Sequence, residues 1–197
     1  MCDLDAIKTL PEREYRAGLA EVIKYGIIYD AALFKQLERN LPRLLERDPA
    51  TLGAVVARCC EIKAHVVGQD ETESGLRAIL NFGHTIGHAI ENISGYGTYL
   101  HGEAISIGQV AAAKLSQSLL GMPSLEVGRV TQLFERAGLP SSINLGAAQR
   151  RRLLEAMHLD KKVSAGEIKF VLAERIGQVK WGQKVPQALI EEMLTKL

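Results

Sequence analysis

Apolar residues recur at three- and four-residue spacing along most of this chain, which is the pattern of helices with one buried face. The longest such run extends from Glu12 to about Leu37, with Gly18 and Gly26 inside it. Because a glycine within a helix costs about 1 kcal/mol relative to alanine, we expect close packing or a ligand at these two positions. The periodicity therefore predicts a mostly α-helical fold.

The rest of the chain divides into shorter segments. The periodicity predicts further helices at 51–67, 76–93, 101–120, 125–137 and 147–157, and a last one that begins at Pro186. The small-residue run 101–120 predicts a buried, closely packed helix. Two short stretches, 168–172 and 178–181, predict a minor β hairpin, and residues 7–10 an extended segment. The length of 197 residues suits one compact domain, residues 1–197. With no βαβ pattern and no G-x-G-x-x-G motif, we expect no dinucleotide-binding half in this chain.

Composition excludes several classes of partner. The 24 basic and 23 acidic residues nearly cancel, and aromatic residues make up only 5% of the chain. We therefore expect no nucleic acid and no membrane as partner. No apolar run has the length of a transmembrane helix and the N-terminus lacks signal-peptide character, so we expect a cytoplasmic protein. Cys2, Cys59 and Cys60 are too few and too badly spaced for a disulfide framework.

The segment GLRAILNFGHTIGHAIE, residues 75–91, is the most informative part of the chain. On one continuous helix, Arg77, Asn81, His84 and His88 fall on a single polar stripe, because their spacings are four, three and four. The neighbours of these residues are mostly apolar. The stripe therefore predicts a wet cleft, with a solvated surface as the alternative.

The histidines of this segment suggest a metal site as a hypothesis. The spacing of His84 and His88 alone is a weak metal signal, but His101 begins the next predicted helix after a short loop. Two histidines, one carboxylate and an open position form a catalytic zinc arrangement. Glu21 is a candidate carboxylate because it lies in the apolar run GLAEVIKYGII, where a bare charge is costly to bury. Either a metal or the nearby Lys24 would compensate that charge.

Several longer motifs together carry a resemblance to a known family. They are KTLPERE at 8–14, AGLAEVIKYGII at 17–28, the lysine of EIKAHVV at 61–67, DETESGLRAILNFGHTIGHAIE at 70–91, LHGEAISIG at 100–108 and DKK at 160–162. In this order, and over essentially the whole chain, the sequence closely resembles the C-terminal domain of 3-dehydroquinate synthase. The resemblance implies the multi-helix, metal- and substrate-binding domain of the dehydroquinate synthase-like fold.

The resemblance also implies roles for individual residues. The family's metal ligands match Glu21, His84 and His101, and the metal would be Zn²⁺ or Co²⁺. Residues at the catalytic centre match His88 as the acid–base histidine, Glu73 as a proton-transfer group, and Lys24. Substrate-holding residues match Lys63, Arg77, Asn81, and one of Lys161 and Lys162. The segment that reaches the nucleotide matches Ile7, Lys8, Thr9 and Leu10.

The implied reaction belongs to the shikimate pathway of chorismate and aromatic amino acid biosynthesis. The family is a carbon–oxygen lyase that converts 3-deoxy-D-arabino-heptulosonate 7-phosphate to 3-dehydroquinate plus phosphate, with NAD⁺ taking and returning a hydride. Lysine and arginine suit an anionic sugar phosphate, since both answer carboxylate and phosphate groups. A homodimer is a further expectation.

The family's enzymes also have an N-terminal, nucleotide-binding half that this chain does not contain. We therefore expect a fragment that binds a divalent metal but does not turn over substrate by itself. Other readings are a related sugar-phosphate cyclase, such as a 2-deoxy-scyllo-inosose synthase-like enzyme, or a metal-dependent alcohol dehydrogenase of the same superfamily. A non-catalytic helical interaction module is the remaining alternative. The presence of Lys63, Arg77, Asn81 and the DKK run favours the synthase.

Overall fold

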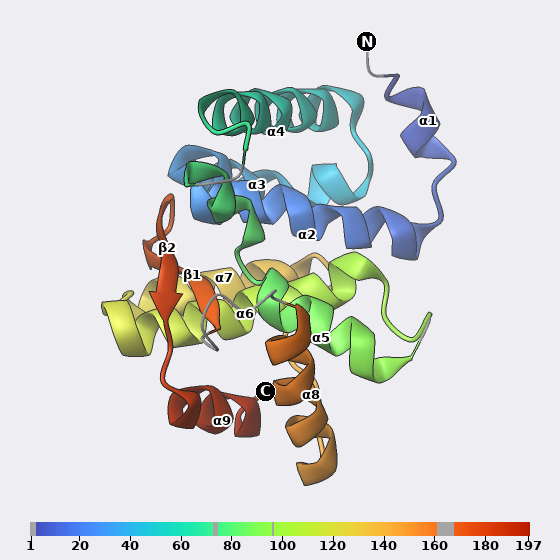
Figure 1. Cartoon of the computed structure of the whole chain (residues 1–197). Helices are drawn as coiled ribbons and strands as arrows, with labels where there is room; N and C mark the ends of the chain where they lie inside the picture. The colour runs from blue at the N-terminus through green and yellow to red at the C-terminus, as the bar shows by residue number, and fades with distance from the viewer. Residues whose placement is uncertain (1–2, 73–74, 96, 161–167) are drawn as a thin grey trace.

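Helices make up most of this chain, with one small β hairpin near the C-terminus (Figure 1). The computed structural model describes residues 3–72, 75–95, 97–160 and 168–197. The elements, in order, are α1 (Asp5–Lys8), α2 (Glu12–Ile28), α3 (Ala31–Leu45), α4 (Pro49–Gln69), the 3₁₀ helix η1 (Leu76–Asn81), α5 (His84–Ser94), α6 (His101–Leu120), α7 (Ser124–Arg136), α8 (Ala147–Asp160), β1 (Lys169–Arg175), β2 (Gln178–Lys184) and α9 (Gln187–Thr195). The predicted mostly α fold with a minor hairpin is confirmed.

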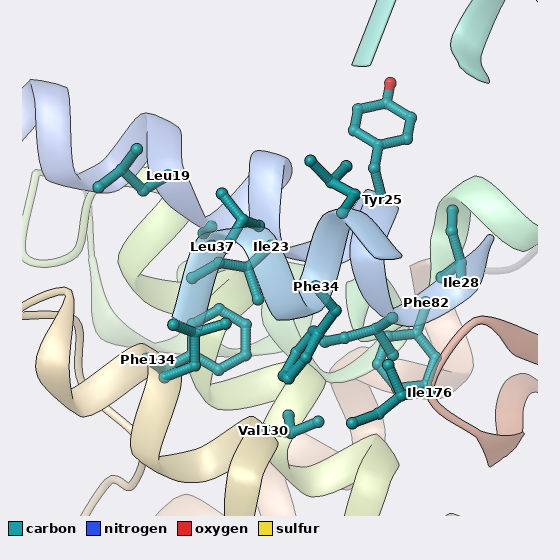
Figure 2. Close-up of a cluster of buried hydrophobic side chains, with 14 of the residues drawn as sticks. Leu19, Ile23, Tyr25, Ile28, Phe34, Leu37, Phe82, Val130, Phe134 and Ile176 are labelled. Carbon is teal, nitrogen blue, oxygen red and sulfur yellow. The ribbon is translucent and has the colours of Figure 1, made fainter. Parts of the chain in front are cut away.

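Helix α6 lies between two hydrophobic clusters. Val110, Ala112 and Ala113 of α6 belong to the larger cluster, built mainly with α2, α3, α4 and α7. Figure 2 shows part of it, where Phe34, Phe134 and Val130 meet below α2 and α3. The opposite side of α6 packs in a second cluster with α5, α8, β1 and α9. The expectation of a buried, closely packed helix over 101–120 is therefore confirmed.

The predicted single helix over 12–37 is wrong, because the chain breaks between α2 and α3. Asp30 has extended backbone geometry, and its side chain accepts hydrogen bonds from the amides of Ala32 and Leu33 at 2.9 and 3.0 Å. This is an N-cap, which starts a new helix. Gly26 lies at the crossing, since a Cβ there would be 3.0 Å from Phe34 Cα. Gly18 has no described neighbour within 4 Å of such a Cβ, so packing explains Gly26 only.

Two other local predictions are also wrong. Residues 7–10 are not extended, because α1 includes Ile7 and Lys8 and a turn follows. The expected helix over 76–93 is divided into η1 and α5 at Phe82 and Gly83, where the backbone of Gly83 is left-handed with φ 78°. The hairpin is confirmed, and its antiparallel strands are longer than predicted. Within the described ranges, no helix has both the length and the apolar character needed to cross a membrane.

Candidate metal centre

Three helices bring the predicted ligands Glu21, His84 and His101 to one point. Glu21 lies in the middle of α2, whereas His84 and His101 are the first residues of α5 and α6. One potential ligand atom of each residue lies within 4.8 Å of those of the other two. The Nε2 atom of His84 is 3.6 Å from Oε1 of Glu21, and the two imidazole centroids are 5.7 Å apart. Two imidazoles and one carboxylate therefore converge as the sequence predicts.

Close helix contacts make this convergence possible. A Cβ at Gly83 would lie 2.5 Å from Gln109 Cγ and 2.6 Å from Gln109 N, so only glycine lets α5 begin against α6. A Cβ at Gly102 would lie 1.8 Å from the carbonyl oxygen of Ala17, which sets α6 directly on α2. These contacts fix the helix ends that carry His84 and His101. Gly83 is therefore required for two separate reasons, its positive φ and its close contact with Gln109.

The carboxylate of Glu21 has two different oxygens. Oε2 accepts a hydrogen bond from the Lys24 ammonium at 2.6 Å, as the ion-pair interpretation predicted. Oε1 is buried and has no hydrogen-bond partner in the described part of the chain. A buried carboxylate oxygen without a donor is costly, and this one faces Nε2 of His84. A divalent cation between these atoms would satisfy it, so the residues fit the metal that the sequence implied.

His84 is prepared as a neutral ligand. Its Nδ1 lies 3.1 Å from the carbonyl oxygen of Phe82, which can only accept. Nδ1 must therefore carry the proton in this hydrogen bond, and Nε2 has a free lone pair directed at Glu21. Burial lowers the pKa of His84 to about 4, and the charge of Lys24 acts in the same direction. The neutral imidazole is the form that binds zinc.

Lys24 and Lys63 approach the centre from two helices. Lys24 is only 3% exposed, and burial lowers the pKa of its ammonium against the opposing charge of Glu21. The like charge of Lys63, an exposed residue of α4, lowers the pKa of Lys24 further. Lys24, predicted at the catalytic centre, and Lys63, predicted to hold substrate, therefore lie close enough to interact electrostatically. Their contact with substrate stays a prediction.

His88 lies beside the candidate ligands on α5. Its ring centroid is 5.2 Å from that of His84 and 5.9 Å from that of His101. It is half-buried, and it is outside the Glu21–His84–His101 group. This position suits a histidine that moves protons next to a metal, which stays a prediction here.

The predicted four-residue stripe is wrong, because the break at Gly83 separates Arg77 and Asn81 from the two histidines. Arg77 belongs to η1, where its backbone amide donates to Asp70 and its guanidinium donates to the carbonyl of Glu71 at 3.0 Å. Both Arg77 and Asn81 are half-buried. The other predicted site residues Glu73, Lys161 and Lys162 lie outside the described residues.

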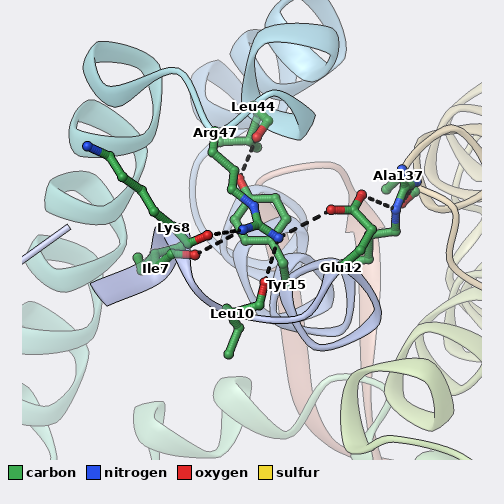
Figure 3. A network of polar contacts seen from close by, with 9 residues as sticks. Ile7, Lys8, Leu10, Glu12, Tyr15, Leu44, Arg47 and Ala137 are labelled. Atoms are coloured by element: carbon green, nitrogen blue, oxygen red, sulfur yellow. Dashed lines mark hydrogen bonds and ion pairs between the residues drawn. The ribbon is translucent and has the colours of Figure 1, made fainter. Parts of the chain in front are cut away.

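The segment Ile7–Leu10 is held in place by Arg47. The Arg47 guanidinium donates to the carbonyl oxygens of Ile7, Lys8 and Leu10 at 3.3, 2.7 and 2.7 Å (Figure 3). The same guanidinium stacks over the ring of Tyr15, 4.7 Å from its centroid. These contacts of Arg47 order the segment that is predicted to reach the nucleotide. The sequence did not predict this role of Arg47.

Two carboxylates near His101 were also missed. Each carboxylate oxygen of Glu91 lies 3.3 Å from Nδ1 of His101. Glu103 accepts from the amide of Leu100 at 2.8 Å and pairs with Arg13 through two bonds of 2.7 Å, which fixes the start of α6. The available signals were the spacing of three residues from His88 to Glu91 and the position of Glu103 two residues after His101.

Comparison with known sequences finds 3-dehydroquinate synthases. Residues 18–163 match the profile of the 3-dehydroquinate synthase C-terminal family. The 3-dehydroquinate synthase of Nitrosomonas europaea is 51% identical over 195 residues, which is 99% of this chain and 52% of that protein. The same enzyme of Desulforamulus reducens is 46% identical over all of this chain and 54% of its own length. The chain thus spans about half the length of these relatives.

Solved structures of related sugar cyclases share the fold. The 2-epi-5-epi-valiolone synthase of Streptomyces hygroscopicus, with NAD⁺ and Zn²⁺ bound, superposes with a TM-score of 0.88 at 26% identity, over 98% of this chain and 54% of that one. A 2-deoxy-scyllo-inosose synthase in complex with carbaglucose-6-phosphate, NAD⁺ and Co²⁺ gives a TM-score of 0.79 at 25% identity, over 98% and 55% of the two chains.

Proposed function

Because this chain belongs to the 3-dehydroquinate synthase family and matches its C-terminal domain, we propose that it is the metal- and substrate-binding part of such an enzyme. The reaction would convert 3-deoxy-D-arabino-heptulosonate 7-phosphate to 3-dehydroquinate plus phosphate. The observation that carries this proposal is the convergence of Glu21, His84 and His101, with a buried carboxylate oxygen that lacks a donor. The bound Zn²⁺ or Co²⁺ of two related cyclases supports it.

The chain's own residues would divide the work by charge and position. Glu21, His84 and His101 would hold Zn²⁺ or Co²⁺, which when bound polarises substrate hydroxyl oxygens and eases their deprotonation. His88, beside but outside the ligand group, would accept and return protons.

Cationic side chains would orient the anionic substrate. Lys24 is paired with Glu21, and Lys63 is an exposed residue of α4 whose charge acts on Lys24. Arg77 and Asn81 would add contacts from η1. One of Lys161 and Lys162 would do so from the 161–167 segment. NAD⁺ is proposed as the hydride acceptor and donor, and the segment Ile7–Leu10 as the part of this chain nearest to it.

By themselves, the 197 residues are proposed to bind metal without completing the reaction. The matched relatives are about twice as long, since the chain covers 52–54% of them. The expected homodimer and cytoplasmic location stay predictions, to be checked by sedimentation and cell fractionation.

Metal titration tests the site. The chain, stripped with a chelator, should take up about one equivalent of Zn²⁺ or Co²⁺, and Glu21→Ala, His84→Ala and His101→Ala should each weaken uptake strongly. His158→Ala on α8 is the matched control and should bind like the parent chain. Unchanged uptake in all three ligand variants would remove the basis of the proposal.

Activity tests the reaction. The chain alone, supplied with substrate, NAD⁺ and Zn²⁺, should form no 3-dehydroquinate, and robust turnover would contradict its proposed dependence on further residues. Fused to the N-terminal half of the Nitrosomonas europaea enzyme, it should restore 3-dehydroquinate formation, and His88→Ala in the fusion should lower kcat. A fusion that prefers a valiolone or inosose precursor would favour a related cyclase, the second candidate that the fold similarity supports.

A further inference from the structure

We propose that Glu91 is a positioning residue, which holds the His101 ring so that Nε2 is presented to the metal. The inference rests on the metal site proposed above. It concerns a carboxylate that none of the predicted site roles includes.

The first observation is the contact itself. Both carboxylate oxygens of Glu91 lie 3.3 Å from Nδ1 of His101. An ionised carboxylate can only accept a hydrogen bond, so Nδ1 must carry the proton that joins the two groups. In the neutral imidazole the lone pair is then on Nε2. Glu91 thus favours the tautomer of His101 in which Nδ1 carries the proton. In this tautomer Nε2, the ring nitrogen that is not bonded to Glu91, is free to bind the metal.

The second observation is that His84 has the same arrangement. Its Nδ1 is 3.1 Å from an obligate acceptor, the carbonyl oxygen of Phe82. Both histidines of the centre therefore have Nδ1 against an acceptor, once from the backbone and once from a side chain. Histidine ligands of metals commonly make such a second hydrogen bond, which fixes the ring and raises the basicity of the ligating nitrogen.

The third observation is exposure. The His84 side chain is 14% exposed, whereas that of His101 is 50% exposed. His101 is also the first residue after a loop. Burial and the hydrogen bond to Phe82 order the His84 ring, but a more exposed ring can rotate among several orientations. Glu91, whose side chain is 32% exposed, lies on the packed helix α5 and supplies the missing constraint.

A rival role for Glu91 is direct metal binding. Ligand atoms of His88, Glu91 and His101 also lie within 4.8 Å of one another. We favour positioning because Glu91 already has a partner in His101, whereas Oε1 of Glu21 is buried without one. The two roles make different predictions for glutamine at this position, since an amide oxygen accepts from Nδ1 but is a poor zinc ligand.

The first experiment needs no metal. In the chelator-treated chain under mildly alkaline conditions, ¹⁵N NMR should show His101 with its proton on Nδ1, and Glu91→Ala should move the population toward Nε2–H. Glu91→Gln should keep the Nδ1–H form. A wild-type ring protonated on Nε2 would overturn the inference whether or not the chain binds metal.

The second experiment measures Co²⁺ and Zn²⁺ affinity by competition with a chelator. Glu91→Ala should weaken binding about 10- to 100-fold at unchanged stoichiometry and unchanged stability of the metal-free chain. Glu91→Gln should recover most of that affinity and should keep the Co²⁺ absorption spectrum of the parent chain. Glu192→Ala on α9 is the matched control.

Full affinity in Glu91→Ala, or an altered Co²⁺ spectrum without recovered affinity in Glu91→Gln, would overturn the positioning role of Glu91 while the proposed site stands. No binding by the parent chain would instead refute the site itself.

Discussion

Gly102→Ala should both destabilise the chain and weaken metal binding, whereas Gly128→Ala should stabilise it. Both glycines lie in helices, Gly102 in α6 and Gly128 in α7. A Cβ at Gly102 would lie 1.8 Å from the carbonyl oxygen of Ala17 and 2.8 Å from its Cα, but at Gly128 none of the described atoms lies within 4 Å. The same methyl group is thus added once to a backbone contact and once to open space.

The expected magnitudes follow from these distances. Contacts under 3.0 Å are essentially never made by a real Cβ, so α2 and α6 must separate by at least 1.2 Å at Gly102. The obstacle is backbone, which no rotamer change can move, so overpacking should cost about 3 kcal/mol. A gain of up to about 1 kcal/mol in helix propensity offsets part of this. The net loss is about 2 kcal/mol, or roughly 4–8 °C in Tm for a chain of this size. Gly128→Ala keeps only the gain, roughly 1–4 °C.

The same displacement should reach the metal centre. Glu21 is carried by α2 and His101 by α6, and their ligand atoms lie within 4.8 Å. Metal–ligand distances tolerate only about 0.2 Å, so a shift of this size should lower Zn²⁺ affinity at least about tenfold, or about 1.4 kcal/mol. Urea unfolding in chelator gives the stability change, and chelator competition gives the affinity. A Gly102→Ala chain as stable as the parent and with its full Zn²⁺ affinity would refute this account of how the helices are placed.

Three further predictions concern Arg47, the two cysteines of α4 and His84. Arg47→Ala should speed amide hydrogen exchange at residues 7–10 and leave the middle of α4 unchanged, because three carbonyl acceptors lose their donor; equal protection in both chains would contradict this role of Arg47. Burial raises the pKa of Cys59 to about 12 while Cys60 is exposed, so alkylation at neutral pH, mapped by peptide mass, should modify Cys60 well before Cys59, and the reverse order would be inconsistent with the packing. Because burial lowers the pKa of His84 to about 4, the unfolded chain holds this proton more tightly between about pH 6.5 and 4. The free energy of unfolding of the metal-free chain should therefore decrease as the pH is lowered through that window, by on the order of 3 kcal/mol from His84. Urea unfolding of His84→Gln should show a smaller decrease. An equal decrease in both chains would argue against a buried, neutral His84.

The residues of the candidate centre were predictable from sequence because their types and motifs are local. Histidine spacing, the apolar surroundings of Glu21 and the LHGEA motif all lie within short stretches of chain. The same is true of the helical periodicity, which located most helices to within a few residues. The roles of these residues remain predictions until metal and substrate binding are measured.

The errors have a common origin in longer-range contacts. The apolar pattern continues through residues 76–93, but the helix divides at Gly83, which has positive φ and lies so close to Gln109 of α6 that it leaves no room for a Cβ. The break at Asp30 is different, since an aspartate N-cap is a local signal that the periodicity obscured. Local patterns thus located elements better than their ends.

Apolar periodicity and motif residues are properties of neighbouring positions, so a helical fold, a family and a set of candidate metal ligands could be predicted without the structure. The contact of the Phe82 carbonyl with His84, next to the break at Gly83, and that of Glu91 with His101 became visible in the packed fold. The same holds for the oxygen of Glu21 that has no donor among the described residues. These relations depend on how closely α2, α5 and α6 approach one another, and that distance is set by backbone contacts at glycines such as Gly102, across helices far apart in the chain.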